Sequence, residues 1–117
     1  MTGGSASPKR GEIWTVDFDP TRGHEQAGKR PALVLSATLF NQGPAGLAVV
    51  LPITSKNKHI PWHVAIAPQD GGLPRVSFIK CEDIRSIAAE RLSKRWGMVS
   101  AASLAQVEDR LRTLLEL

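Results

Sequence analysis

Two unbroken runs of aliphatic residues lie in the first half of the chain, at residues 32–35 and 47–53. Continuous apolar runs of this length are typical of strands buried on both faces, and the paired valines of the second run favour a strand over a short helix. The polar segment 21–30 (TRGHEQAGKR) leads into the first run, and the polar segment 54–59 (TSKNKH) follows the second. Residues 38–46, with two glycines and a proline, form the connection. We therefore expect two central strands, each with a charged loop at one end.

Other segments alternate between apolar and polar positions. Trp14, Val16 and Phe18 alternate with polar residues, which predicts a strand over residues 11–18 with its large side chains on one face. Residues 62–66 alternate in the same way.

The glycines of residues 70–72 allow the chain to reverse after this second alternating segment. Residues 76–81 then return as its hairpin partner. After the hairpin we expect a short helical turn over residues 84–89 and a closing strand over residues 92–99.

The C-terminal segment has the spacing of an amphipathic helix. Its apolar residues recur on one face, with charged residues opposite; they are Leu104, Val107, Leu111, Leu114 and Leu115. The N-cap is Ser100, or Ser103 with Gln106 as a capping box. Strands first and a helix last predict a mainly β, α+β fold, in which a helix packs on a small, strongly bent antiparallel sheet or barrel.

Composition narrows the class of protein. A chain of 117 residues with 42% hydrophobic content forms one core, so we expect one domain over residues 10–117 after a disordered tail of residues 1–9. The net charge of +4 permits a polyanionic partner such as nucleic acid. With Cys81 as the only cysteine, the chain has no internal disulfide and no cysteine-based metal site, and Cys81 itself is expected in the core. No segment has the pattern of a signal peptide or a membrane span, so we expect a soluble, cytoplasmic protein.

The polar residues do not form a recognisable cofactor site. His24, His59 and His63 lie on separate segments, whereas a metal site needs several ligands at helix or loop spacing. Gly23 and Gly28 are not followed by a helix, as a phosphate-binding loop would require. We therefore expect no metal or nucleotide cofactor.

What remains suits phosphodiester chemistry without a metal. Arg30 can contact two phosphate oxygens and stabilise a transition state with extra negative charge, and Thr54 can donate its hydroxyl to the same phosphate. Both lie where an apolar strand meets a polar loop, so neighbouring strands can bring them together. The base that removes a ribose 2′-hydroxyl proton is sought among Glu25, His24 and Glu82. The residues alone leave open a purely structural role for Arg30 and Thr54.

Three motifs in the right order carry a family resemblance. They are RGEIWTVDFDPTRGHEQAGKRPALVLS at residues 10–36, PITS at 52–55 and IKCEDIRSI at 79–87. Together they resemble the MazF/PemK (Kid) toxins of bacterial toxin–antitoxin pairs. The resemblance implies an SH3-like β-barrel with a C-terminal helix, acting as a homodimer. It also implies a metal-independent endoribonuclease that cuts single-stranded mRNA at short sequence motifs and leaves a 2′,3′-cyclic phosphate and a 5′-hydroxyl.

Motif position assigns the roles that the resemblance implies. The catalytic arginine and threonine of the family fall on Arg30 and Thr54, and the acidic loop residue falls on Glu25. The RNA-binding residues that we expect are His24, Gln26, Lys29, Lys56, Lys58, Lys80 and Arg85.

The third motif departs from the family pattern. In the PemK branch an Arg-Cys-Asp triplet has acid and base roles, and here the aligned residues are Lys80, Cys81 and Glu82. Glu82 remains a candidate catalytic carboxylate, one methylene longer than aspartate. Asp83 stands where the family usually has glutamine, so it adds charge where an amide would be able to read a base.

The resemblance also implies partners. We expect a MazE-like antitoxin whose acidic, extended C-terminus covers a basic groove, contact with DNA only through that antitoxin, and no membrane. Two alternatives share the fold: a barrel that binds RNA or antitoxin without cutting, and a gyrase poison like CcdB. The CcdB alternative needs a tryptophan pattern at the end of the helix, which residues 114–117 lack.

Overall fold

The computed structural model describes residues 7–18 and 28–117, and its sheet is organised around β3 (Leu47–Thr54). One edge of β3 pairs with β2 (Lys29–Val34). The other edge pairs first with β6 (Arg85–Ala88) and then, at Ile53 and Thr54, with β5 (Ser77–Lys80). The two long aliphatic runs are therefore the central strands that the sequence predicts.

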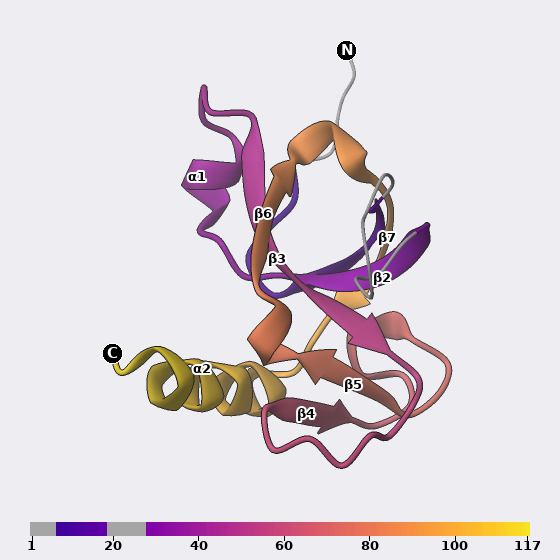
Figure 1. Cartoon of the computed structure of the whole chain (residues 1–117). Coiled ribbons are helices and arrows are strands. Elements are labelled where there is room, and N and C mark those ends of the chain that lie inside the picture. Colours follow the sequence, from indigo (N-terminus) through magenta and orange to yellow (C-terminus); the bar gives the residue numbers. More distant parts are fainter. Residues whose placement is uncertain (1–6, 19–27) are drawn as a thin grey trace.

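The remaining strands extend this arrangement in both directions. β1 (Glu12–Asp17) pairs with β2, β7 (Leu92–Met98) pairs with β1, and β4 (His63–Ile66) pairs with β5, all antiparallel. The seven-stranded sheet has the order β4-β5-β3-β2-β1-β7, with β6 beside β3. Figure 1 shows β2, β3, β6 and β7 curving around a common space. The bent antiparallel sheet is confirmed, although it is not closed into a barrel.

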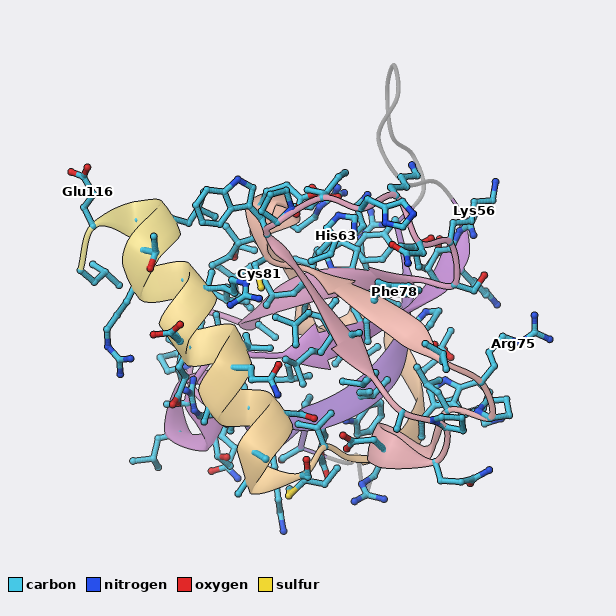
Figure 2. The ribbon with its side chains drawn as sticks, turned by 90° about the horizontal axis from the view of Figure 1, so that it is seen from below. Lys56, His63, Arg75, Phe78, Cys81 and Glu116 are labelled. Carbon is cyan, nitrogen blue, oxygen red and sulfur yellow. The ribbon has the colours of Figure 1, made fainter. Side chains whose placement is uncertain are left out.

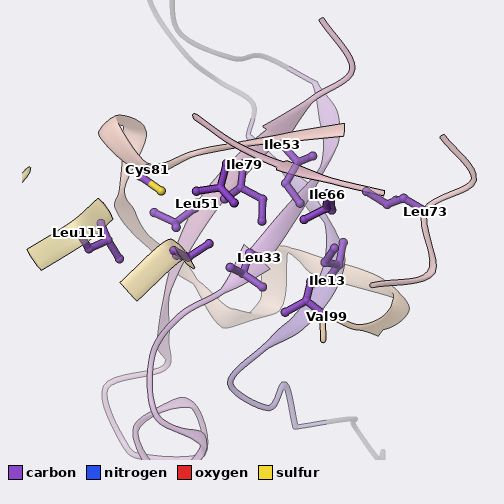
Figure 3. Packing of buried hydrophobic residues seen from close by; sticks show 12 residues of the cluster. Ile13, Leu33, Leu51, Ile53, Ile66, Leu73, Ile79, Cys81, Val99 and Leu111 are labelled. Atoms are coloured by element: carbon purple, nitrogen blue, oxygen red, sulfur yellow. The ribbon is translucent and has the colours of Figure 1, made fainter. Parts of the chain in front are cut away.

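The bent sheet buries a different apolar cluster on each face. In β2, Leu33 packs into one cluster, while Ala32 and Val34 pack into the other. The first cluster, shown in Figure 3, consists of Ile13, Leu33, Leu51, Ile53, Val64, Ile66, Leu73, Ile79, Cys81, Val99, Val107 and Leu111. The second consists of Trp14, Val16, Phe18, Ala32, Val34, Ala48 and Val50. Burial of both faces explains why β2 and β3 have no polar alternation.

The C-terminal helix α2 (Ala101–Leu115) covers the first cluster with Val107 and Leu111. Its N-cap is Ser100, whose Oγ accepts a hydrogen bond from the Ser103 backbone N–H at 3.1 Å. The helix and the first of the two predicted caps are confirmed. In Figure 1, α2 lies beside the β4–β5 hairpin, below the curved part of the sheet.

The prediction of a helical turn over residues 84–89 is wrong. Arg85–Ala88 is the strand β6, in which Ile87 pairs with Ala48 of β3 and packs against the second cluster. Pairing with an open edge of β3 outweighs the weak local preference of an Ile-Ala segment. A short helix, α1 (Thr38–Asn41), lies within the connection expected over residues 38–46.

The described residues also contain three short 3₁₀ segments, η1 (Asp70–Gly72), η2 (Cys81–Asp83) and η3 (Ala89–Arg91). No helix in the described ranges is both long and apolar enough to cross a membrane.

At the N-terminal end, Pro8 is buried and the Lys9 backbone N–H donates to Glu12 Oε1 at 2.8 Å. Residues 1–6 of the predicted tail lie outside the described residues, so the division of the chain at residue 10 stays a prediction.

Candidate active site

Arg30 and Thr54 meet because of the register between β2 and β3. Ala32 pairs with Pro52 and Val34 with Val50, and extending this register by two residues places Arg30 opposite Thr54. Both side chains line one pocket of about 230 Å³ at this end of the two strands. The expectation that neighbouring strands bring these two residues together is confirmed.

The pocket combines cations, hydroxyls and apolar walls. Its described lining includes two guanidinium groups and three hydroxyl groups. The lining residues are Arg30, Pro31, Ile53, Thr54, Ser55, Leu73, Pro74, Arg75, Ser77 and Trp96. Because guanidinium and hydroxyl groups donate hydrogen bonds and arginine stays charged at ordinary pH, this lining suits an anion such as a phosphodiester.

Thr54 is oriented by its own strand end. Its Oγ1 accepts a hydrogen bond from the Lys56 backbone N–H at 3.2 Å. A hydroxyl that accepts one hydrogen bond still has its proton to donate. Thr54 can therefore donate to an anion in the pocket while the turn after β3 holds its oxygen in place.

A close contact between backbones forms the wall of the pocket. Gly72, at φ +87°, lies so near β7 that a Cβ there would be 2.2 Å from the Trp96 carbonyl oxygen. Only glycine fits at this position, because a side chain would overlap backbone atoms as well as require an unfavourable φ. The contact holds Leu73–Arg75, which follow Gly72, beside Trp96.

Two further contacts fix this wall. Trp96 Nε1 donates to Thr15 Oγ1 at 2.9 Å, which ties β7 to β1. Asp70 accepts hydrogen bonds from the Ser100 backbone N–H at 2.8 Å and from Ser103 Oγ at 2.5 Å, which ties η1 to the start of α2. The wall is therefore anchored to both the sheet and the helix.

Sequence reasoning did not find Arg75, Ser77 or Trp96 as part of the site. Arg75 belongs to the loop between η1 and β5, and Trp96 to β7, so both reach the pocket through tertiary packing. The Gly71-Gly72 pair predicts only a chain reversal. No local pattern marks the loop after it as a neighbour of Arg30.

Several predicted site residues lie elsewhere. Lys56 and Lys58 are exposed on the loop after β3, and Lys29 is exposed at the start of β2. Figure 2 shows Lys56 and Arg75 on the side of the molecule away from Glu116, at the end of α2. His24, Glu25 and Gln26 lie outside the described residues, so their roles stay predictions.

Lys80 and Arg85 form a second polar cluster with Asp83. Lys80 Nζ lies 3.5 Å from Asp83 Oδ2, and Arg85 Nη2 donates to Asp83 Oδ1 at 2.7 Å. The Arg85 guanidinium also lies over the ring of Phe18, 4.9 Å from its centroid. The negative charge of Asp83 is therefore shared by two cations.

Glu82 has a different partner from Asp83. Its Oε2 lies 2.9 Å from Nε2 of His63, the first residue of β4. Glu82 is not among the described residues that line the pocket of Arg30 and Thr54. The structure therefore brings together Arg30 and Thr54 but does not bring Glu82 to them.

Cys81 is a core residue, as expected. It is fully buried in the first cluster. Burial, together with the negative charge of Glu82, raises the pKa of its thiol to about 11, while Arg110 opposes the shift. Cys81 is therefore a neutral thiol near pH 7, not a thiolate nucleophile or ligand.

The described residues contain no cluster of three or more His, Cys, Asp or Glu side chains with the geometry to hold a metal ion. The described lining of the pocket likewise contains no carboxylate or imidazole. The described residues of the pocket can therefore bind an anion. A reaction that removes a proton there needs a base from outside this lining.

The sequence profile of the PemK-like, MazF-like toxins of type II toxin–antitoxin systems matches residues 9–115. The chain belongs to this family. Among similar proteins, endoribonuclease MazF9 from Mycobacterium tuberculosis is 44% identical over 115 residues, covering 93% of this chain and 97% of that protein.

Solved structures of MazF toxins share the fold. The crystal structure of MazF (Form-I) from Deinococcus radiodurans has a TM-score of 0.84 to this MazF-like chain at 32% identity, covering 97% of this chain and 100% of that one. The MazE-MazF (Form-II) structure from the same organism has a TM-score of 0.79 at 33% identity, covering 97% of this chain and 99% of that one. The agreement extends over nearly the whole MazF-like toxin.

Proposed function

We propose that this chain is the endoribonuclease toxin of a toxin–antitoxin pair and that it cleaves single-stranded mRNA at the pocket of Arg30 and Thr54. The observation that carries the proposal is the meeting of these two residues at the ends of adjacent strands, in a chain of the MazF/PemK family. The endoribonuclease names of its relatives support the activity.

The pocket suits cleavage by the ribose 2′-hydroxyl. In this reaction the 2′ oxygen loses its proton to a base and attacks phosphorus, the P–O5′ bond breaks, and the 5′ oxygen takes up a proton. The products are a 2′,3′-cyclic phosphate and a 5′-hydroxyl. Arg30 stabilises the negative charge that builds up on the phosphorane oxygens, and Thr54 donates a hydrogen bond to one of them.

The base that starts the reaction comes from outside the described lining of the pocket. One candidate is Glu82: Thr54 pairs with Phe78 in β5, and Glu82 follows Phe78 by four residues in the chain. The candidates from the sequence segment 19–27 are Glu25 and His24. Alanine at each of the three positions, assayed by single-turnover cleavage, identifies the base as the variant that loses the chemical step.

The exposed cations around the pocket suit the path of an RNA strand. Lys29, Lys56 and Lys58 are exposed near the ends of β2 and β3, and Arg75 lies in the pocket itself. Lys80 and Arg85 add positive charge beyond β5 despite their contacts with Asp83. Binding through such phosphate contacts weakens as salt rises.

The same surface suits the partners of a toxin. The complexes of MazE with MazF among the similar structures support a MazE-like antitoxin for this chain. We further propose that it acts in the cytoplasm as a homodimer, that residues 10–117 form the toxin domain, and that DNA contact occurs only through the antitoxin.

Incubation of the purified protein with mixed-sequence RNA in EDTA tests the activity. We expect fragments from the wild type, a loss of at least about a hundredfold in rate for Arg30→Ala, and no loss for Arg112→Ala, which removes an exposed arginine of α2. RNA that stays bound but intact would instead favour a binder without catalytic activity. Equal rates for wild type and Arg30→Ala would refute the assignment of the site.

A further inference from the structure

A buried histidine holds the Glu82 carboxylate. The His63 side chain is 3% exposed, and its Nε2 lies 2.9 Å from Oε2 of Glu82, whose own side chain is 31% exposed. Figure 2 labels His63 and Cys81 beside the β4–β5 hairpin. Glu82 therefore has a buried partner on one side and reaches solvent on the other.

The second ring nitrogen of His63 indicates which atom carries the proton. Nδ1 is buried and has no hydrogen-bond partner among residues 7–18 and 28–117. A proton on Nδ1 would leave a buried donor unpaired, whereas a proton on Nε2 is donated to the carboxylate. His63 is therefore an Nε2–H donor that fixes the direction of Glu82.

The two cations near Glu82 contact Asp83, the next residue along the chain. Lys80 and Arg85 both contact Asp83, at 3.5 and 2.7 Å. Burial and the charge of Glu82 raise the pKa of the adjacent Cys81 thiol to about 11, so that thiol is neutral. Glu82 thus presents accepting oxygens to solvent, in an orientation set by a buried group.

The sheet register gives the position of His63, the partner of Glu82, relative to the pocket. His63 pairs with Lys80 across β4 and β5, and Thr54 pairs with Phe78 across β3 and β5. Two strand spacings across and two residues along separate His63 from Thr54 by about 12 Å. Glu82, two residues after the end of β5, is not among the described residues that line the pocket of Arg30 and Thr54, so its exposed side suits the base of a neighbouring nucleotide.

We propose that Glu82 is a specificity-determining residue that binds one base flanking the cut, and that His63 is its positioning residue. The proposal rests on the proposed function for the identity of the ligand as RNA. A carboxylate only accepts hydrogen bonds, so it selects a base that presents N–H donors on its Watson–Crick edge.

Guanine fits this carboxylate best among the four bases. Its N1–H and N2–H lie side by side and match the two carboxylate oxygens, and Oε2 has a second lone pair besides the one used by His63. Uracil presents its single N3–H between two carbonyl oxygens, which a carboxylate repels. We therefore expect guanine to be favoured and uracil to be excluded at this position.

The test measures binding separately from cleavage. A random-sequence 2′-O-methyl RNA library cannot be cut, because the nucleophile is blocked, and it is selected on wild type, Glu82→Gln, His63→Gln, His63→Leu and the control Glu116→Gln. We expect wild type and Glu116→Gln to enrich guanine about tenfold or more at one position. Glu82→Gln loses this enrichment because an amide presents one donor and one acceptor. His63→Gln keeps an N–H donor and retains the enrichment, whereas His63→Leu weakens it.

Matching enrichment by wild type and Glu82→Gln would overturn the proposal, whether or not His63→Leu folds. Parallel cleavage of ordinary RNA separates the two proposals. If the wild-type protein enriches guanine but does not cleave ordinary RNA, the proposed activity is refuted and the base contact stands. A Glu82→Gln variant that loses cleavage of every sequence equally places Glu82 in the chemistry and overturns the base contact.

Discussion

Gly72 packs directly against the backbone of Trp96, and a Cβ at Gly72 would lie 2.2 Å from the Trp96 carbonyl oxygen. This contact joins η1 to β7 and forms the wall of the pocket that holds Arg30 and Thr54. The loop that carries Arg75 begins directly after Gly72, so this glycine places it beside the pocket.

Gly72→Ala should destabilise the protein strongly. The methyl group would overlap the backbone of β7 and would also require a positive φ, which alone costs about 1–3 kcal/mol. Gly46→Ala is the matched control, because Gly46 has φ +67° and no described atom beyond its chain neighbours lies within 4 Å of where its Cβ would be. Thermal unfolding should show a larger decrease in melting temperature for Gly72→Ala than for Gly46→Ala. Equal decreases would mean that the close contact does not make Gly72 less tolerant of a side chain.

Glu12 should make stability depend on acid pH. Although burial raises it, hydrogen bonds from Arg95, the Lys9 backbone and Trp14 leave the pKa of Glu12 below its usual value. A carboxylate whose pKa is lower in the folded state stabilises the fold above its unfolded pKa, and this contribution is lost as the pH falls through the folded pKa.

The Glu12→Gln variant tests this linkage. At pH 7 it should lower the free energy of unfolding by about 1–3 kcal/mol, because Arg95 loses its charged partner. The difference from wild type should shrink as the pH falls below about 4, where the wild-type carboxylate is protonated too. Denaturant unfolding at several pH values measures the difference in unfolding free energy between the two proteins. A difference that stays constant from pH 7 to pH 3 would contradict a lowered pKa for Glu12.

Cys81 should resist alkylation in the folded protein. Its thiol is buried, and burial together with Glu82 raises its pKa to about 11, so little thiolate exists at pH 8. Iodoacetamide labelling followed by mass spectrometry should show slow modification of native protein and fast modification in urea. Comparable rates in both states would contradict this description of Cys81.

Arg75→Ala should weaken RNA binding more than it slows the chemical step. Arg75 lines the pocket but is exposed, so we expect it to bind phosphate beside Arg30. Loss of one charged hydrogen bond raises KM by about tenfold, and loss of one phosphate contact lowers the slope of log binding constant against log salt by about one. The control Arg112→Ala should leave both quantities unchanged; an Arg75→Ala variant with wild-type KM and salt slope refutes this role.

The sequence predicted those parts of the site that lie at the ends of apolar runs. Residues 32–34, 48 and 50–53 are buried, and their side chains divide between the two faces of the sheet, so the apolar pattern alone identified β2 and β3. Arg30 and Thr54 then followed as residues where a strand meets a loop. Their opposition depends only on the antiparallel register of two neighbouring strands.

The rest of the site depends on contacts that leave no local pattern. Arg75 and Trp96 reach the pocket through the contact between Gly72 and β7. His63 finds Glu82 only because β4 and β5 pair in a particular register. The local pattern of β6 is that of a helical turn. The segment is nevertheless a strand, because Ile87 is buried by pairing with the edge of β3 and not by its sequence neighbours.

The chemistry of the cut RNA ends shows whether the ribose 2′-hydroxyl is the nucleophile at the pocket of Arg30 and Thr54. Long RNA is cleaved in EDTA by wild type, Arg30→Ala and Thr54→Val, and the products are examined by mass spectrometry. We expect 2′,3′-cyclic phosphate and 5′-hydroxyl ends from the wild type, and loss of these products by about a hundredfold or more in both variants. Ends with a 5′-phosphate, or cyclic phosphate produced equally well by the two variants, would contradict this expectation.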